Sequence, residues 1–240
     1  MASLKHRIAL ITGASRGIGQ AVAIRFAREG AQVILTARDV RGLEATDDAI
    51  RAQGSLPAAL VPLDLRDAAA IAALSQAVAQ RFGRLDVLVG NAGVLGELSP
   101  VAHTSPDEWE RVLQVNLTAN MQLIRAFDPL LKLSAAPRAL FVSSGVARSL
   151  HPYWGAYAVS KAALEMMVKL YAAENEKTAL RANLIDPGAV RTRMRAQAMP
   201  GEDPEQLPAP EAITDVFVKL ASDAMMATGE VFRAYDHYTH

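Results

Sequence analysis

Two kinds of hydrophobic pattern alternate along the chain. Short apolar runs rich in Val, Ile and Leu are typical of strands that are buried on both faces of a parallel sheet. These runs predict strands at 7–12, 32–37, 58–63, 85–89, 138–142, 180–185 and 229–234. The segments between them space their apolar residues as helices do and predict helices at 20–29, 43–52, 68–82, 105–133, 156–174 and 212–220.

This alternation predicts an α/β fold with a doubly wound parallel sheet and helices on both faces. At 240 residues the chain is the size of one such unit, so we expect a single domain over residues 1–240. Residues 191–210 are polar and rich in proline and methionine, which predicts a loop with a short helix. Ligands of such sheets bind beyond the carboxyl ends of the strands, so the residues that follow each strand are the candidates for function.

A glycine-rich turn follows the first predicted strand and opens a helix. Glycines there let the backbone approach a pyrophosphate, and the helix N-terminus supplies amide donors. The spacing is GxxxGxG rather than GxGxxG, so a purely structural turn is the alternative. The pattern favours a Rossmann-like dinucleotide-binding unit, with contacts from Gly13, Ser15, Arg16, Gly17, Ile18 and Gly19.

The end of the second predicted strand is where the ribose of a bound adenosine is distinguished. An acidic residue there favours NAD, whereas an arginine favours the 2′-phosphate of NADP. Ala37 ends the strand, and Arg38 and Asp39 follow it. Arg38 and Arg16 together offer two guanidinium groups to a phosphate. The sequence therefore favours NADP(H) over NAD(H), with Asp39 keeping NAD as the alternative.

Other strand ends carry residues suited to the same cofactor. Asp64, beside Leu65, is placed either to bond the adenine amino group or to cap the helix that begins near Asp67. Small residues after the fourth strand, which are Asn91, Ala92 and Gly93, would let a cofactor lie against the backbone. Asn116 lies in an apolar helical pattern and needs a polar partner, either structural or a water in a proton path.

Residues 144–161 carry the side chains for a reaction. Tyr157 and Lys161 are four residues apart and share a face of the predicted helix, and Ser144 precedes Tyr157 by thirteen residues. A phenol has a pKa of about 10, and a neighbouring ammonium lowers it. Such a tyrosine can exchange a proton with a carbonyl or alcohol oxygen that Ser144 holds. The pattern predicts interconversion of C=O and CH–OH, and a chance pairing on an ordinary helix is the alternative.

Composition narrows the function further. Lys+Arg and Asp+Glu number 25 each, so no basic excess indicates a nucleic acid or a membrane surface as partner. The chain has no cysteine, which excludes disulfides and a cysteine-ligated metal, and we expect no metal site. We find neither a transmembrane run nor a signal peptide and expect a cytoplasmic protein.

Six motifs taken together resemble those of the short-chain dehydrogenase/reductase family. They are TGASRGIG at 12–19, NAG at 91–93, the asparagine of VNLTAN (Asn116), Ser144, YAVSK at 157–161 and PGAVRT at 187–192. They occur in the family's order and spacing and cover nearly the whole chain, so the resemblance is specific.

The resemblance implies a role for each matching position. Tyr157 would be the general acid or base, and Lys161 would lower its pKa and bond the nicotinamide ribose. Ser144 would orient the substrate oxygen, and the spacing to Tyr157 selects it over Ser143. Asn116 would support a water-linked proton relay. Contacts to the carboxamide and diphosphate side of the cofactor would come from Pro187, Gly188, Val190 and Thr192.

The substrate is expected to meet three loops, at 94–100, 150–154 and 191–210. Their apolar residues would line its pocket, with ordinary packing as the alternative for each: Leu95, Leu150, Tyr153, Trp154 and Met194. His151 has no acidic partner in view and is interpreted as a pocket wall. Family members are usually dimers or tetramers, so the resemblance implies a homodimer or homotetramer packed through the helices around Asn116 and Tyr157.

The leading interpretation is an oxidoreductase that acts on a small-molecule carbonyl or secondary alcohol with NADP(H), such as a carbonyl or 3-oxoacyl reductase. An NAD-dependent alcohol dehydrogenase is the alternative within enzymes. A non-catalytic NADP(H)-binding regulatory protein is the alternative from another class. The combination of Asn116, Ser144, Tyr157 and Lys161 argues against a regulatory protein, because a sensor has no need of all four.

Overall fold

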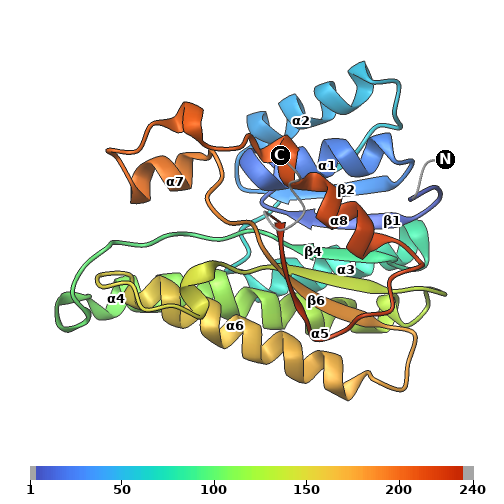
Figure 1. Ribbon diagram of the computed structural model, residues 1–240. Coiled ribbons are helices and arrows are strands. Elements are labelled where there is room, and N and C mark those ends of the chain that lie inside the picture. Colours follow the sequence, from blue (N-terminus) through green and yellow to red (C-terminus); the bar gives the residue numbers. More distant parts are fainter. Residues whose placement is uncertain (1–3, 235–240) are drawn as a thin grey trace.

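The computed structural model describes residues 4–234, in which a parallel sheet of seven strands lies between two layers of helices (Figure 1). The strand order is β3-β2-β1-β4-β5-β6-β7. The strands are β1 (Ile8–Thr12), β2 (Gln32–Ala37), β3 (Ala59–Pro62), β4 (Val87–Gly90), β5 (Arg138–Val142), β6 (Arg181–Asp186) and β7 (Val231–Arg233). The predicted doubly wound parallel sheet is confirmed. The ends of the predicted unit 1–240 lie outside the described residues.

Each face of the sheet is covered by its own helices and its own apolar core. One layer contains α1 (Gly17–Arg28), α2 (Val40–Ala52) and α8 (Thr214–Ala221). The other contains α3 (Ala68–Phe82), α5 (Ala119–Leu131) and α6 (Gly155–Glu174). Phe26 and Phe217 are fully buried in the first core, and Phe127 and Phe141 in the second. Strands buried on both faces need apolar side chains at every position, which explains the continuous apolar runs.

The predicted helix 105–133 is interrupted in the structure. It consists of α4 (Pro106–Leu113), one π-helical segment η2 (Gln114–Thr118) and α5. Ser105 caps α4, since its side chain accepts from Glu108 N at 3.2 Å. Glu108 does not complete a capping box, because its carboxylate accepts from Glu97 N at 2.8 Å instead. Helices interrupted in this way are often found at functional sites.

Several boundaries also differ from the sequence prediction. Helix α1 begins at Gly17 rather than at residue 20, so the last glycines of the turn belong to the helix. The segment 191–210 contains α7 (Arg193–Ala198), which projects from the rest of the molecule in Figure 1. The remaining short elements are the 3-10 turns η1 (Val101–His103), η3 (Gly145–Ala147), η4 (Pro204–Gln206) and η5 (Pro210–Ile213).

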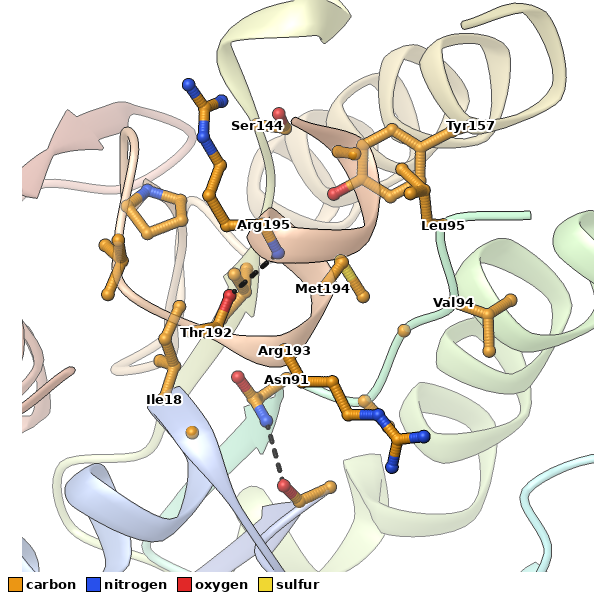
Figure 2. Close-up of a pocket in the computed structure, with 18 of the residues that line it drawn as sticks. Ile18, Asn91, Val94, Leu95, Ser144, Tyr157, Thr192, Arg193, Met194 and Arg195 are labelled. Atoms are coloured by element: carbon orange, nitrogen blue, oxygen red, sulfur yellow. Dashed lines mark hydrogen bonds between the residues drawn. The ribbon is translucent and has the colours of Figure 1, made fainter. Parts of the chain in front are cut away.

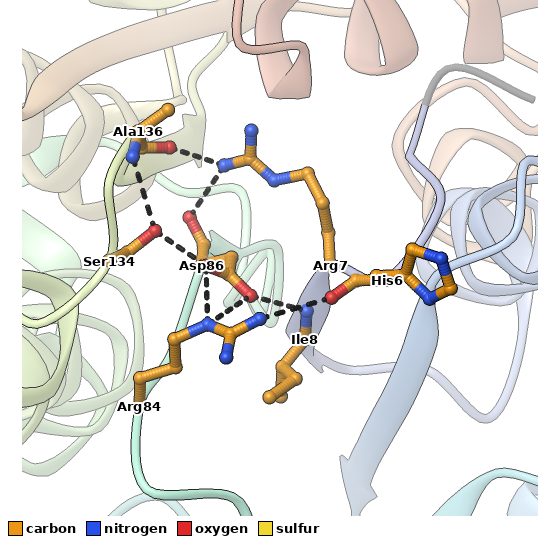
Figure 3. A network of polar contacts seen from close by, with 7 residues as sticks. All are labelled: His6, Arg7, Ile8, Arg84, Asp86, Ser134 and Ala136. Atoms are coloured by element: carbon orange, nitrogen blue, oxygen red, sulfur yellow. Dashed lines mark hydrogen bonds and ion pairs between the residues drawn. The ribbon is translucent and has the colours of Figure 1, made fainter.

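A buried polar network joins the strands at their amino ends (Figure 3). The carboxylate of Asp86, just before β4, accepts from Ile8 N at 2.8 Å and from Arg84 Nε at 3.1 Å. Arg7 donates to the carbonyl oxygen of Asp86 at 3.0 Å, and Ser134 donates to its carboxylate. This network fixes β1 against β4 at the edge opposite the functional strand ends.

Within residues 4–234 no helix is long and apolar enough to cross a membrane.

Candidate active site

The carboxyl ends of the strands open onto one cavity of about 980 Å³. Figure 2 shows the side chains of Ser144 and Tyr157 close together in it, with Asn91 and Ile18 further along. Most of the predicted site residues line it, namely Gly13, Ser15, Arg16, Gly17, Ile18, Arg38, Asp64, Leu65, Asn91, Ala92, Gly93, Leu95, Ser144, Trp154, Tyr157, Lys161, Pro187, Gly188, Val190, Thr192 and Met194. Gly19, Asn116, Leu150 and Tyr153 do not.

The glycine turn is packed tightly against the end of β4. Thr12 Oγ1 accepts from Asn91 N and Ala92 N at 3.0 Å each, and Asn91 Nδ2 donates to Thr12 O at 2.8 Å. A Cβ on Gly19 would lie 2.3 Å from Gly13 O and 2.4 Å from Asn91 Nδ2. Gly19 therefore allows close approach of helix to strand behind the cavity wall, although it does not face the cavity itself.

Arg16 and Arg38 are exposed at the mouth of the cavity. Asp39 beside them is the N-cap of α2, and its Oδ1 accepts from Gly42 N at 3.1 Å. One oxygen of its carboxylate is thus engaged with the helix, although Asp39 also lines the cavity. Two guanidinium groups and one partly engaged carboxylate are therefore available to a ligand at the end of β2.

The sequence predicts that Asp64 either bonds the adenine amino group or caps α3, and the structure excludes the cap. The cap of α3 is Asp67, whose Oδ1 accepts from Ala70 N at 3.0 Å. Asp64 lines the cavity and is paired with Arg66 at 2.6 Å. Hydrogen bonding to Arg66 is the main cause that lowers the pKa of Asp64, and the charge of Arg38 adds to it. The adenine contact of Asp64 stays a prediction.

Tyr157 and Lys161 lie on one face of α6, as predicted, and both are buried. Burial raises the pKa of Tyr157 to about 12; interaction with the Ser144 hydroxyl acts in the lowering direction, and the charge of Asp186 raises the pKa further. Lys161 Nζ donates to Val142 O at 2.7 Å, and burial lowers its pKa to about 8. The expected lowering of the Tyr157 pKa by the lysine is therefore wrong for this structure, because desolvation of the phenolate dominates.

Asn116 lies in the π-helical segment and is fully buried. Its Oδ1 accepts from Val94 N at 2.8 Å, and its Nδ2 donates to Val94 O at 2.9 Å and Ser160 Oγ at 3.0 Å. The side chain thus ties the loop after β4 to α6, which is the structural alternative considered above. It does not line the cavity, and its part in a proton relay stays a prediction.

The predicted substrate wall is only partly assembled. Leu95, Trp154 and Met194 line the cavity, and the Trp154 ring meets the Tyr157 ring edge-on at 6.0 Å. Leu150 is 100% exposed and Tyr153 is 60% exposed, so their placement in the pocket is contradicted. Tyr153 has a left-handed backbone with φ of 75°, and side chains on either side of such a turn diverge. His151 is part of the wall, as expected.

Charged residues that the sequence analysis did not identify lie behind Ser144. Arg148 pairs with Glu165 and with Asp186, two carboxylates that are 4% and 1% exposed. Glu165 follows Lys161 by four residues, as Lys161 follows Tyr157. That repeated spacing on one buried helix face is the signal that could have revealed Glu165. No comparable spacing in the sequence indicates Arg148, because its partners are distant in sequence.

The chain belongs to the short-chain dehydrogenase family, whose family model, described as short chain dehydrogenase, matches residues 7–203. The uncharacterized oxidoreductase YciK of Escherichia coli K12 is 40% identical over 234 residues, which cover 96% of this chain and 92% of YciK. The fold described above is thus that of an oxidoreductase family.

Two further similar proteins are described with a bound cofactor or with a reaction of their own. A short-chain dehydrogenase structure from Escherichia coli CFT073, complexed with NADPH, superposes with a TM-score of 0.93 at 39% identity and covers 98% of this chain and 99% of that chain. The rhamnolipids biosynthesis 3-oxoacyl-[acyl-carrier-protein] reductase of Pseudomonas aeruginosa is 36% identical over 219 residues, which cover 88% of this chain and 82% of that protein.

Proposed function

We propose that this oxidoreductase reduces a carbonyl compound, such as a ketone or 3-oxoacyl compound, with NADPH. The observation that carries the proposal is one cavity that is lined both by Arg16 and Arg38, which follow β1 and β2, and by Ser144 and Tyr157, whose side chains lie close together in Figure 2. The two arginines suit a phosphorylated adenosine ribose, and the two hydroxyls suit a carbonyl oxygen. The 3-oxoacyl reductase among the relatives supports this class of substrate.

The residues present fit a dinucleotide. Gly13 and Gly17 have left-handed backbones, with φ of 66° and 58°, which glycine adopts without strain, so the turn at the start of α1 carries no side chain at these two positions. The N-terminus of that helix would hold the diphosphate. Arg16 and Arg38 would bind the 2′-phosphate of NADP(H), since Asp39 is occupied as a helix cap. The NADPH held by the similar protein of E. coli CFT073 supports this preference.

The chain's own groups suit the reductive direction. The cofactor, when bound, supplies the hydride to the carbonyl carbon. Tyr157, with a pKa of about 12, is protonated at neutral pH and is ready to give its proton to the carbonyl oxygen. Ser144 would hold that oxygen against Tyr157. Lys161, with a pKa of about 8, is placed to exchange protons near neutrality and thereby to help restore the phenol.

Titration with NADPH and NADH, followed by nicotinamide fluorescence, tests the cofactor. We expect NADPH to bind at least about tenfold more tightly, and Arg38→Ala to weaken NADPH selectively. A preference for NADH would instead support an NAD-dependent alcohol dehydrogenase. A screen of ketones and 3-oxoacyl compounds then tests the reaction. Tyr157→Phe should bind NADPH normally and lose turnover, and normal turnover in that variant would contradict the mechanism.

We further propose that residues 1–240 act as one domain that pairs with a second copy. Strands from residue 8 to residue 233 share one sheet, which supports the first point. The outer faces of α5 and α6, with the end of η2, form a mainly apolar groove lined by Leu117, Met121, Ile124, Ala163, Met166, Met167, Leu170, Tyr171 and Glu174. An exposed apolar groove on two adjacent helices is typical of a subunit interface.

A further inference from the structure

One guanidinium group holds together three segments behind the proposed catalytic serine. Arg148 follows the turn η3 and pairs with Glu165 on α6 and with Asp186 at the end of β6. Ser143, at the end of β5, also donates to Glu165 Oε1, at 2.6 Å. Asp186 in turn accepts from Gly188 N at 3.1 Å, in the segment proposed to contact the cofactor.

The contacts on Glu165 bracket Ser144 on both sides. The residue before Ser144 donates to this carboxylate, and Arg148, four residues after Ser144, donates to the same oxygen. Between these anchors the backbone is closed by bonds from Ala147 N to Ser144 O at 3.0 Å and from Arg148 N to Gly145 O at 3.1 Å. Ser144 therefore has little freedom to move relative to the helix that carries Tyr157.

We propose that Arg148 is a positioning residue of the reaction, which fixes the Ser144 turn on α6 and offsets part of the charge of two buried carboxylates, Glu165 and Asp186. Lys169, whose Nζ lies 4.0 Å from Glu165 Oε2, is another cation beside this pair. This proposal rests on the function proposed above for Ser144 and Tyr157. It extends that function to a residue whose own side chain is bound to carboxylates rather than directed to the reacting atoms.

The electrostatic part follows from where the two carboxylates lie. Asp186 raises the pKa of Tyr157, and Glu165 raises that of Lys161. Buried carboxylates without a cation would strengthen both effects. The charged or titratable side chains that line this part of the cavity or pair with its carboxylates come from five places: Lys161, Glu165 and Lys169 on α6; Arg148 and His151 before it; Asp186 at the end of β6; Arg193 and Arg195 on α7; and Arg111 on α4. Of these, Arg195 and Arg111 are already paired with Glu202 and Glu108.

The pH profile of alcohol oxidation tests the electrostatic part, because oxidation requires the deprotonated phenol. Arg148→Met should move the midpoint of the profile upward by about one pH unit. Asp186→Asn should move it downward, and the double variant should lie between them. If Arg148 were only structural, Arg148→Met would lower the rate, and the midpoints of Arg148→Met and Asp186→Asn would not move in opposite directions. Midpoints that stay fixed or move together would overturn the electrostatic part.

Amide hydrogen exchange tests the positioning part without any need for turnover. Residues 143–149 should exchange at least about tenfold faster in Arg148→Met than in the wild type. Ser143→Ala, which removes one hydroxyl and no charge, should loosen the same segment and serves if Arg148→Met does not fold. Arg28→Met is the matched control, since Arg28 is exposed on α1 away from the cavity. Unchanged exchange in both site variants would overturn the positioning role.

These two readouts separate the inference from the function on which it rests. If the wild type binds NADPH but reduces no carbonyl compound, the proposed function fails, and hydrogen exchange still decides the positioning role. If the wild type turns over and Tyr157→Phe does not, while the Arg148 and Asp186 variants keep the wild-type midpoint, only the electrostatic part fails.

Discussion

The ammonium nitrogen of Lys161 lies 5.7 Å from the centre of the Tyr157 ring and donates to Val142 O at 2.7 Å. Burial lowers its pKa from 10.5 to about 8. Between these pH values the unfolded chain binds more protons than the folded chain, so stability rises as the pH rises from about 8 to 10. Below pH 8 the folded state carries the full cost of the buried cation, about 3 kcal/mol by linkage.

We therefore predict that Lys161→Met stabilises the protein at pH 7 while abolishing turnover. The gain should be about 1 to 2 kcal/mol, because losing the bond to Val142 O offsets part of the relieved cost. Urea unfolding of the wild type and the variant at pH 7 and pH 10 measures the free energy of unfolding with Lys161 charged and with Lys161 neutral. The wild type should gain stability between these pH values, and the variant should gain less.

The control for this variant is Lys219→Met, because Lys219 is exposed on α8. Its removal should leave both the stability at pH 7 and the pH dependence within about 0.5 kcal/mol of the wild type. A Lys161→Met protein that is less stable at pH 7 and keeps the full pH dependence would show that the ammonium is not the source of the cost.

A second prediction concerns the glycine turn. Gly19→Ala places a methyl group 2.3 Å from Gly13 O, so helix α1 has to move away from β1. We expect a loss of about 1 to 3 kcal/mol in stability and at least about tenfold in NADPH affinity. Gly201→Ala is the control, because no atom lies within 4 Å of the added Cβ. Equal NADPH affinities for the two variants would refute the packing argument.

A third prediction distinguishes the roles of Arg38 and Asp39, the two charged residues that follow β2. Asp39→Ala should lower stability by about 1 kcal/mol, as the loss of an N-cap does, and leave the NADPH to NADH affinity ratio unchanged. Asp67→Ala removes the equivalent cap of α3 and should have the same cost. If Asp39→Ala shifts the ratio toward NADPH, Asp39 reads the ribose and the assignment of the two residues is reversed.

Local chemistry made much of this site predictable from the sequence. The spacing between Tyr157 and Lys161 places them on one helical face whatever the tertiary structure, and both the glycine turn and the strand ends follow from local pattern. The pKa of Tyr157 was not predictable in the same way, because it depends on burial by residues distant in sequence and on Asp186. The direction inferred from Lys161 alone was accordingly wrong.

The interrupted helix around Asn116 shows the same limit. Its apolar pattern predicted one continuous helix over 105–133, and the structure divides that helix into three segments. The π-helical segment arises where Asn116 bonds Val94 and Ser160, and neither partner is visible in local periodicity. Contacts between segments distant in sequence therefore set the finer geometry of the site.

A fourth prediction tests the substrate wall. Trp154→Ala should raise the KM for the carbonyl substrate about tenfold, because Trp154 lines the cavity and packs on the Tyr157 ring. Leu150→Ala removes a fully exposed side chain and should change KM less than twofold. A large effect of Leu150→Ala would mean that the loop closes over the substrate with this side chain inside.

A fifth prediction concerns assembly. Met166 and Leu170 are 59% and 56% exposed and line the apolar groove of α5 and α6, and exposed apolar side chains gathered in one patch are typical of an interface. If this face pairs with a second copy, Leu170→Glu buries a charge in the interface and should convert the protein to monomers in sedimentation equilibrium.

Leu56→Glu is the control, because Leu56 is 63% exposed outside the groove, and this variant should leave the mass unchanged. A wild type that sediments as a monomer would refute pairing, and a Leu170→Glu dimer would assign the contact to another face. Loss of dimers in both variants would point to general damage instead. Because α6 also carries Tyr157 and Lys161, dissociation that lowers kcat while leaving NADPH affinity intact would show that pairing steadies the catalytic helix.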